Sequence, residues 1–468
     1  MTAAGAAAAA DAECRSWLTT LDSSAQVWSL DVAIGPGGTT TLGGSFFGAI
    51  QFDGLPPLEQ NTPEPVYDEH SFTVESGGTD GFLIAFGPRG GVDWRRRIGG
   101  VDDDETVAAG LNAAGRVYAA GNITGQAQFS GVELTARGSH AYGAVFNPDG
   151  KALAAQLAKD WSSVQARRGA VDAQGNVYVL GMRSTPDDEC EFDDEDRPCL
   201  SDLFLAKFAP DGSPRWSTRT SGDAQAQSRT IAVDASGKIH IAGAFSGALN
   251  IADQSLLAAG ESDLLLATYN PDGTLAGARR AATGNAAPID LATDRDGNRY
   301  VVGTHWDPTT FGTDTELPMP PLGGFGGVTA TDGLFIARFA PSGALDWVEI
   351  AEDPDTERGW LDIASIGADA SGNSYVIGWG YQWQDSGDVI EAVDRGRFFL
   401  AQFDPSGQVA WVERADRAEE YGTRAGDLAV DDEGNVHVAS FAAPGASIGG
   451  LTLQGESNMF VWRRCRTQ

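Results

Sequence analysis

The sequence has few basic residues for its length. In 468 residues it has 32 lysines and arginines against 65 aspartates and glutamates, which gives a formal net charge of −33. A phosphate backbone would be repelled by this charge, so the composition disfavours nucleic acid as a partner. Adaptation to high salt is another source of such acidity.

Long apolar runs and an export signal are also missing. No apolar stretch approaches the length of a membrane-spanning helix, so we expect no membrane span. Residues 1–12 are rich in alanine but lack the basic start and leucine-rich core of a secretion signal. We expect this leader to be disordered and residues 13–468 to form a single domain.

Catalytic patterns are scarce. The five histidines include no pair with metal-ligand spacing. We therefore assign no catalytic residue, although abundant carboxylates leave a glycosidase pair open.

What the chain does contain is one pattern that recurs seven times. In its clearest copy, residues 170–216, an apolar strand ends at Asp172 and a turn through Gly175-Asn176 leads to a second strand that ends at Gly181. A third strand covers residues 203–208, and the turn Pro210-Asp211-Gly212 leads to a strand that carries Trp216. Proline and glycine at these places are typical of tight hairpin turns.

The glycine that ends the second strand marks the repeat. It recurs at Gly43, Gly121, Gly181, Gly243, Gly303 and Gly378, with Ser440 in the seventh place. Seven units of four strands predict an all-β fold, a seven-bladed β-propeller of four-stranded blades. A solenoid is the alternative, but neither terminus has the polar cap that a solenoid needs.

The pattern Val-Asp-x-x-Gly-Asn-Val-Tyr-Val at residues 171–179 resembles the bacterial seven-bladed β-propeller repeat family and, more distantly, NHL repeats. The resemblance covers residues 14–465. It implies the propeller fold together with secretion or surface display, and no defined activity.

The two ends of the chain predict how the ring closes. The last repeat has no fourth strand after residues 459–464, whereas residues 15–19 match the strand that carries the repeat tryptophan. We therefore expect the N-terminal segment to supply the outer strand of the last blade, which pairs an otherwise open edge.

The four cysteines fit this closure. Cys14 and Cys465 fall at the two sides of the missing hairpin turn, where cross-strand partners lie within disulfide reach. We predict a Cys14–Cys465 disulfide and a second one, Cys190–Cys199, within one loop; four free thiols are the alternative. Disulfides indicate an oxidising compartment, so we expect an extracellular, periplasmic or cell-surface protein.

Connections on one face of the propeller vary in length and chemistry, and function is expected there. One of them is strongly acidic, and it supplies the candidate calcium ligands Asp187, Asp188, Asp193, Asp194 and Asp196. Further acidic clusters lie at residues 102–105 and 352–357. Solvated acidic loops without metal are the alternative.

The tryptophans divide into two sets. Five hold repeat positions and are interpreted as packing residues: Trp17, Trp94, Trp216, Trp347 and Trp411. A second set of aromatic residues lies in or beside the variable connections and predicts a glycan or protein contact: Trp161, Trp306, Trp360, Trp379, Tyr381 and Trp383. Packing of the long loops is the alternative for this second set.

An aspartate opens the third strand in several repeats, as at Asp80, Asp202 and Asp263. Its recurrence predicts a hydrogen bond that builds the blade.

The sequence thus predicts an exported, monomeric, non-enzymatic binding propeller that presents acidic loops and tryptophans to a glycan or a partner protein. One alternative is a hydrolase or lyase at the channel mouth, which Arg168, Arg229 and Arg424 would line. The other is a structural component of the cell surface.

Overall fold

The computed structural model describes residues 14–23, 26–52, 55–59, 78–158, 164–184, 201–222, 226–306, 308–312, 315–317, 333–350, 360–385, 390–417, 426–442, 444–454 and 459–466. Within these ranges the regular structure is strand, apart from one short 3-10 turn, η1 (Pro36–Gly38). No helix in this part of the chain is long and apolar enough to cross a membrane.

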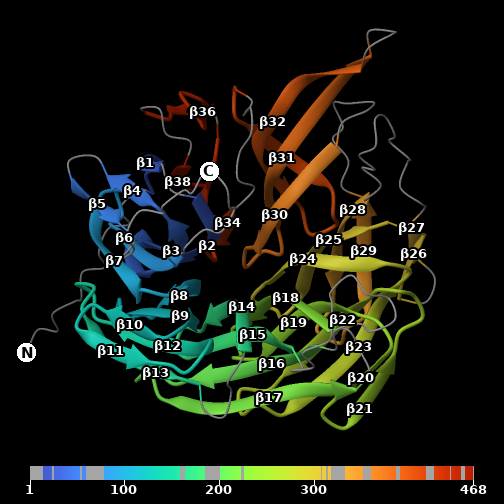
Figure 1. Cartoon of the computed structure of the whole chain (residues 1–468). Coiled ribbons are helices and arrows are strands. Elements are labelled where there is room, and N and C mark those ends of the chain that lie inside the picture. The colour runs from blue at the N-terminus through green and yellow to red at the C-terminus, as the bar shows by residue number, and fades with distance from the viewer. Residues whose placement is uncertain are drawn as a thin grey trace, which may run out of the picture.

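Six blades are each built from one continuous stretch of chain (Figure 1). From the innermost strand outward they are blade 1, β2 (Gln26–Ile34), β3 (Thr40–Phe47), β6 (Asp80–Phe86) and β7 (Val92–Gly100); blade 2, β8 (Glu105–Leu111), β9 (Val117–Ile123), β12 (His140–Phe146) and β13 (Ala152–Leu157); blade 3, β14 (Val164–Val171), β15 (Val177–Ser184), β16 (Ser201–Phe208) and β17 (Pro214–Gly222); blade 4, β18 (Ala226–Val233), β19 (Ile239–Phe245), β22 (Asp263–Tyr269) and β23 (Leu275–Thr283); blade 5, β24 (Ala286–Thr293), β25 (Arg299–His305), β28 (Gly333–Phe339) and β29 (Leu345–Ile350); and blade 6, β30 (Trp360–Ala368), β31 (Ser374–Asp385), β32 (Ile390–Phe403) and β33 (Val409–Arg414).

A further sheet, the closing blade, takes strands from both ends of the chain. β34 (Asp427–Val430), β35 (Val436–Phe441) and β38 (Met459–Arg464) come from the C-terminal part, and β1 (Trp17–Ser23) pairs with β38 as the fourth strand. The innermost strands contact one another in the cyclic order β2, β8, β14, β18, β24, β30, β34 and back to β2. The predicted all-β propeller is therefore confirmed, with the qualification that continuous segments build six blades and both chain ends build the remaining sheet.

The predicted Cys14–Cys465 disulfide is confirmed. The two Cα atoms are 5.8 Å apart, within disulfide range, and the bond lies beside the Trp17↔Arg463 pair of β1 and β38. It stands where the other blades have a covalent hairpin turn between their third and fourth strands. Cys190 and Cys199 lie outside the described residues.

Hairpins between second and third strands were not predicted, and they extend four of the sheets to six strands. The first strand of each hairpin pairs with the outer strand of the preceding blade. The hairpin β4 (Ala49–Phe52) and β5 (Leu55–Glu59) pairs with β1, and the hairpin β10 (Gln126–Phe129) and β11 (Val132–Thr135) pairs with β7. The hairpin β20 (Ala248–Ile251) and β21 (Gln254–Leu257) pairs with β17, and the hairpin β26 (Thr309–Phe311) and β27 (Thr315–Leu317) pairs with β23. One further hairpin, β36 (Ser447–Ile448) and β37 (Leu451–Thr452), forms a two-stranded sheet. These hairpins connect neighbouring blades and cover strand edges.

The repeat glycine has a steric role. A Cβ atom at Gly121, Gly181, Gly303 or Gly378 would lie 1.8–2.4 Å from a carbonyl oxygen of the inner strand, beside a β-bulge. Glycine permits this close approach. In blade 1 the pairing places Gly44, and not Gly43 as predicted, at this position.

Candidate functional site

The innermost strands bring polar side chains together at one level of the ring. We call inner ring the residues that lie three positions before the end of each inner strand. They are Asp31, Ala108, Arg168, Thr230, Asp290, Ser365 and Asp427. Asp31, Arg168, Asp290 and Asp427 are partly exposed, whereas Thr230 and Ser365 are buried. Three carboxyl groups and one guanidinium group thus converge from four different blades.

Each inner-ring carboxylate also binds the neighbouring blade. It accepts a hydrogen bond from the backbone N–H that follows the ring residue of that blade: Ala109 to Asp31 at 2.5 Å, Val32 to Asp427 at 2.7 Å, and Ile366 to Asp290 at 3.0 Å. These bonds fix the direction of the carboxylates and join inner strands that have no ladder between them.

The hydroxyl group of Ser365 lies between two carboxyl groups. Its Oγ is 2.7 Å from an oxygen of Asp290 and 2.8 Å from an oxygen of Asp427. A serine hydroxyl has one proton to donate, so both contacts are hydrogen bonds only when one carboxyl group carries a proton. The geometry therefore indicates a proton held between Asp290 and Asp427.

The electrostatics of the ring agree with a retained proton. Burial, followed by the charge of Asp290, raises the pKa of Asp427 to about 7. Burial, followed by the charge of Asp427, raises the pKa of Asp31 well above its usual range. Arg168 opposes both shifts. Carboxyl groups that exchange protons near neutral pH can accept or donate hydrogen bonds to a polar ligand, and they occur at functional sites.

The sequence predicted this site only in part. Arg168, expected at a channel mouth, belongs to the inner ring. Arg229 precedes the ring residue of blade 4, is exposed and donates to Gln227 at 2.9 Å, and Arg424 lies outside the described residues. The three aspartates were missed, although each interrupts an apolar strand at the same distance from its turn.

The variable-face aromatic residues are placed only in part. Trp379 is 3% exposed and packs in a core cluster with Phe398, Leu400 and Trp462. For Trp379 the structure therefore favours packing over ligand contact, which corrects its assignment to a binding surface. Trp306 is partly exposed. Trp161 and the side chains of Trp360, Tyr381 and Trp383 lie outside the described part.

The predicted calcium ligands Asp187, Asp188, Asp193, Asp194 and Asp196 lie outside the described residues, as does the cluster at 352–357. The cluster at 102–105 is described, and it is engaged by the protein itself: Asp104 is 0% exposed and accepts hydrogen bonds from the backbone of Gly100 and Thr124. Burial raises the pKa of Asp104 to about 7. Within the ranges that the structure describes, no group of three or more His, Cys, Asp or Glu residues could hold a metal ion.

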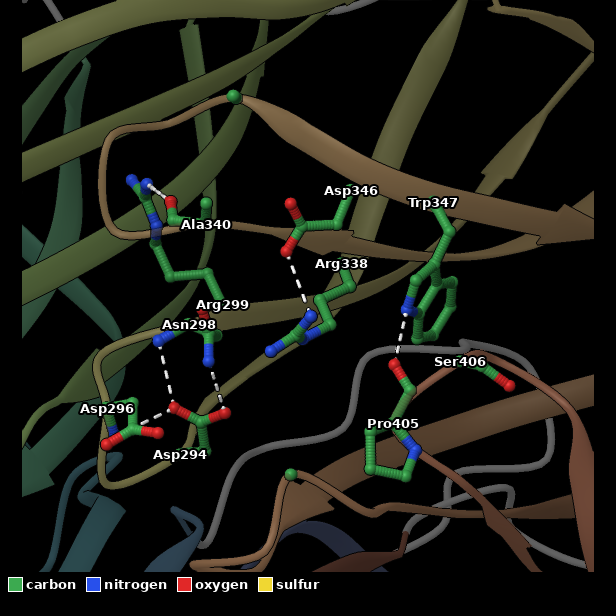
Figure 2. Close-up of polar contacts among 12 residues, drawn as sticks. Asp294, Asp296, Asn298, Arg299, Arg338, Ala340, Asp346, Trp347, Pro405 and Ser406 are labelled. Atoms are coloured by element: carbon green, nitrogen blue, oxygen red, sulfur yellow. Dashed lines mark hydrogen bonds and ion pairs between the residues drawn. The ribbon is translucent and has the colours of Figure 1, made fainter.

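The recurrent turns and tryptophans have structural partners, as Figure 2 shows for blade 5. Asp294 accepts hydrogen bonds from the backbone of Asp296 and from both the backbone and side chain of Asn298, at 2.7–3.0 Å. Trp347 Nε1 donates to the Pro405 carbonyl oxygen of blade 6 at 3.0 Å. Trp94 and Trp216 make the same bond to Pro148 and Pro271, so the packing role predicted for these tryptophans is confirmed.

The aspartates that open third strands also have the role predicted for them. Asp80 forms an ion pair with Arg97 at 3.3 Å, and Asp263 forms one with Arg280 at 3.6 Å, in each case on the fourth strand of the same blade. Both carboxylates are 0% exposed, so these residues build the blade rather than a ligand site.

Comparison with known proteins identifies no family. No family model matches the sequence, and no curated protein matches it. Solved structures with a similar arrangement include a PL25 ulvan lyase (8% identity over 95% of this chain and 94% of that chain, TM-score 0.42) and a gluconolactonase from Xanthomonas campestris (13% identity, 78% and 86%, TM-score 0.34). A puromycin hydrolase is also similar (12% identity, 90% and 58%, TM-score 0.37). At these identities the likeness concerns the fold alone, and the resemblance to the bacterial repeat family stays a prediction.

Proposed function

We propose that the protein is an exported, non-enzymatic propeller that binds a glycan, and that the inner ring is its principal contact. The observation that carries the proposal is the convergence of Asp31, Arg168, Asp290 and Asp427 at one partly exposed level. The variable-face aromatic residues other than Trp379 and the acidic loop at residues 187–196, with or without calcium, remain proposed outer contacts for the glycan or for a partner protein.

The chemistry of the inner ring suits sugar hydroxyl groups. A hydroxyl both donates and accepts hydrogen bonds, and the ring offers carboxylates as acceptors and the Arg168 guanidinium as a donor. The net charge of −33 repels polyanions, so neutral or amino sugars are the favoured class. The disulfide Cys14–Cys465 supports export, because such bonds persist in oxidising compartments.

A hydrolase or lyase is the second candidate function, and one observation favours it. Asp427 has a pKa of about 7 and shares a hydroxyl group with a second carboxyl group, an arrangement that also serves general acid–base catalysis. The same experiment separates the two functions.

The test is calorimetric titration of the full chain with neutral, amino and acidic oligosaccharides, followed by analysis of each mixture for cleaved products. We expect binding without cleavage, and a loss of about tenfold in affinity for Arg168→Gln because one hydrogen bond to the sugar is removed. Arg229→Gln, next to the ring and exposed, is the matched control and should bind like the parent. If products form and Asp427→Asn abolishes their formation, the protein is an enzyme instead. If none of the three glycan classes binds, the proposal is refuted.

A further inference from the structure

The closing blade carries an unusual row of side chains where it meets blade 1. His437 lies opposite Arg463 on the adjacent strand, and Arg463 lies opposite Trp17 on the next. Directly opposite residues point to the same face of a sheet, so the three side chains form one row. All three are buried, with exposed fractions of 0%, 8% and 7%.

In blade 3 the corresponding row is Tyr178, Lys207 and Trp216, and protein acceptors satisfy it. The Tyr178 hydroxyl donates to Asp172 at 3.1 Å, and Lys207 Nζ and Trp216 Nε1 both donate to the Pro271 carbonyl oxygen, at 3.0 and 3.2 Å.

Blade 5 repeats this solution. The Tyr300 hydroxyl donates a hydrogen bond to Asp294. Figure 2 shows that Arg338 donates to the Asp346 carboxylate and that Trp347 donates to the Pro405 carbonyl oxygen. In these two blades the polar groups of the row therefore find partners within the protein.

The closing blade has the equivalent acceptors, Asp431 and the Pro88 carbonyl oxygen, but they do not satisfy its row. Trp17 Nε1, His437 Nε2 and Arg463 Nε are buried, and the described structure offers none of them a hydrogen-bond partner. One contact of the guanidinium group is a long bond of 3.3 Å from Nη1 to the Pro88 carbonyl oxygen. Because buried donors without acceptors cost free energy, three of them in one row require an explanation.

Arg463 also lacks an ion-pair partner, although the charge of Asp431 partly opposes the lowering of its pKa by burial. No carboxylate of the described residues lies within ion-pair distance of it, and nearby Asp431 already accepts from Asn435 and from the backbone of Glu433. Burial, followed by the charge of Arg463, lowers the pKa of His437 to about 3, so this ring is neutral. Its Nδ1 faces the Thr40 hydroxyl at 2.7 Å, and when Nδ1 accepts that proton, Nε2 carries the free N–H.

We propose that a small monovalent anion of the halide class binds between the closing blade and blade 1, with Arg463 Nε, Trp17 Nε1 and His437 Nε2 as its donors. A monovalent ion balances the single guanidinium charge. A larger oxyanion does not suit the close packing, because Phe86 stacks on Trp17 at 6.0 Å and the Gly38 backbone lies directly against the guanidinium group. This site is separate from the inner ring and does not depend on the proposed glycan function.

The first test measures the thermal midpoint of the full chain in sodium chloride, bromide and gluconate at equal ionic strength. We expect a saturable rise with chloride and bromide relative to gluconate, because a ligand that binds only the folded state stabilises it. Arg463→Gln should abolish the halide response. Arg338→Gln is the matched control, because it changes the same row position in blade 5, where Asp346 and Tyr300 satisfy the arginine, and the response should remain.

Two further measurements keep the proposal testable if Arg463→Gln fails to fold. Trp17→Phe keeps an aromatic ring but removes one donor, and it should weaken the apparent halide affinity about tenfold. A bromide-soaked crystal should show an anomalous peak beside Arg463 Nε. Equal midpoints in chloride and gluconate, or ordered water alone at this position, would overturn the proposal.

Discussion

His240 and His437 occupy the same position in their blades and have different partners. His240 Nε2 lies 2.9 Å from Asp234, whereas His437 turns Nδ1 toward Thr40 of the next blade and leaves Nε2 without an acceptor. Burial lowers the pKa of both rings, so both are neutral near pH 7. The repeat position therefore defines where a side chain lies, and the partners available there decide what it does.

Asp427 allows a residue-scale prediction about pH. Its pKa is about 7 in the folded chain against about 3.9 in an unfolded one, so the folded state holds the proton more tightly. The resulting stability is fully present below about pH 4 and is lost as pH rises through 7. Asp427→Asn should remove this dependence and raise the free energy of unfolding at pH 8 by about 1–3 kcal/mol, because an amide can donate to Ser365 and accept from Val32.

Urea unfolding at pH 5 and pH 8 measures this effect, and Asp294→Asn provides the contrast. Asp294 only accepts hydrogen bonds, from the backbone and side chain of its own turn and from Tyr300. An amide there should lower stability by about 1–3 kcal/mol at both pH values. Equal losses for the two variants at pH 8 would contradict a retained proton at Asp427.

At this scale the sequence predicted the packing residues better than the site. The repeat tryptophans and third-strand aspartates recur, so their roles could be read from one copy. The inner-ring aspartates do not recur in every repeat, and their proximity depends on closing the ring, which no local spacing reveals. The buried state of Trp379 likewise depends on contacts with the closing blade.

At the scale of elements, the hairpins between second and third strands are the main feature that the sequence did not predict. Their strands are short, and their partner is the preceding blade rather than their own. In the β10–β11 hairpin, Phe129 is 0% exposed, lies opposite Ile98 of β7 and packs edge-on against Tyr142 at 4.9 Å. One aromatic side chain thus anchors the hairpin between two blades.

Phe129→Ala should lower the free energy of unfolding by about 3–5 kcal/mol, because a fully buried ring leaves a cavity. It should also speed hydrogen exchange at the β7 edge around Ile98. Val132→Ala, at the opposite position of the same hairpin, is the control and should cost about 1 kcal/mol or less because that side chain is only partly buried. Unchanged exchange at β7 in Phe129→Ala would show that the hairpin does not protect that edge.

At the scale of the whole molecule, ring closure was the feature best predicted from sequence. The last repeat lacks a fourth strand, the N-terminal segment contains its tryptophan, and the two cysteines fall where a turn would join them. These three observations are local, yet together they define a contact between residues 451 positions apart. The anion site proposed beside this contact could not be predicted, because it follows from donors that are left without acceptors only in the folded closing blade.

The closing disulfide should therefore control the stability of the whole ring. Without it, β1 is held by its pairing with β38 and by packing of Trp17 on Phe86, so the strand can separate and expose the edge of β38. We expect Cys14→Ser with Cys465→Ser to lower the free energy of unfolding by about 2–5 kcal/mol and to promote self-association. The measurements are urea unfolding and light scattering. Cys190→Ser with Cys199→Ser is the control for thiol removal as such, and it should leave self-association unchanged. If the Cys14/Cys465 variant unfolds at the parental urea concentration, strand pairing alone closes the ring and the disulfide is dispensable.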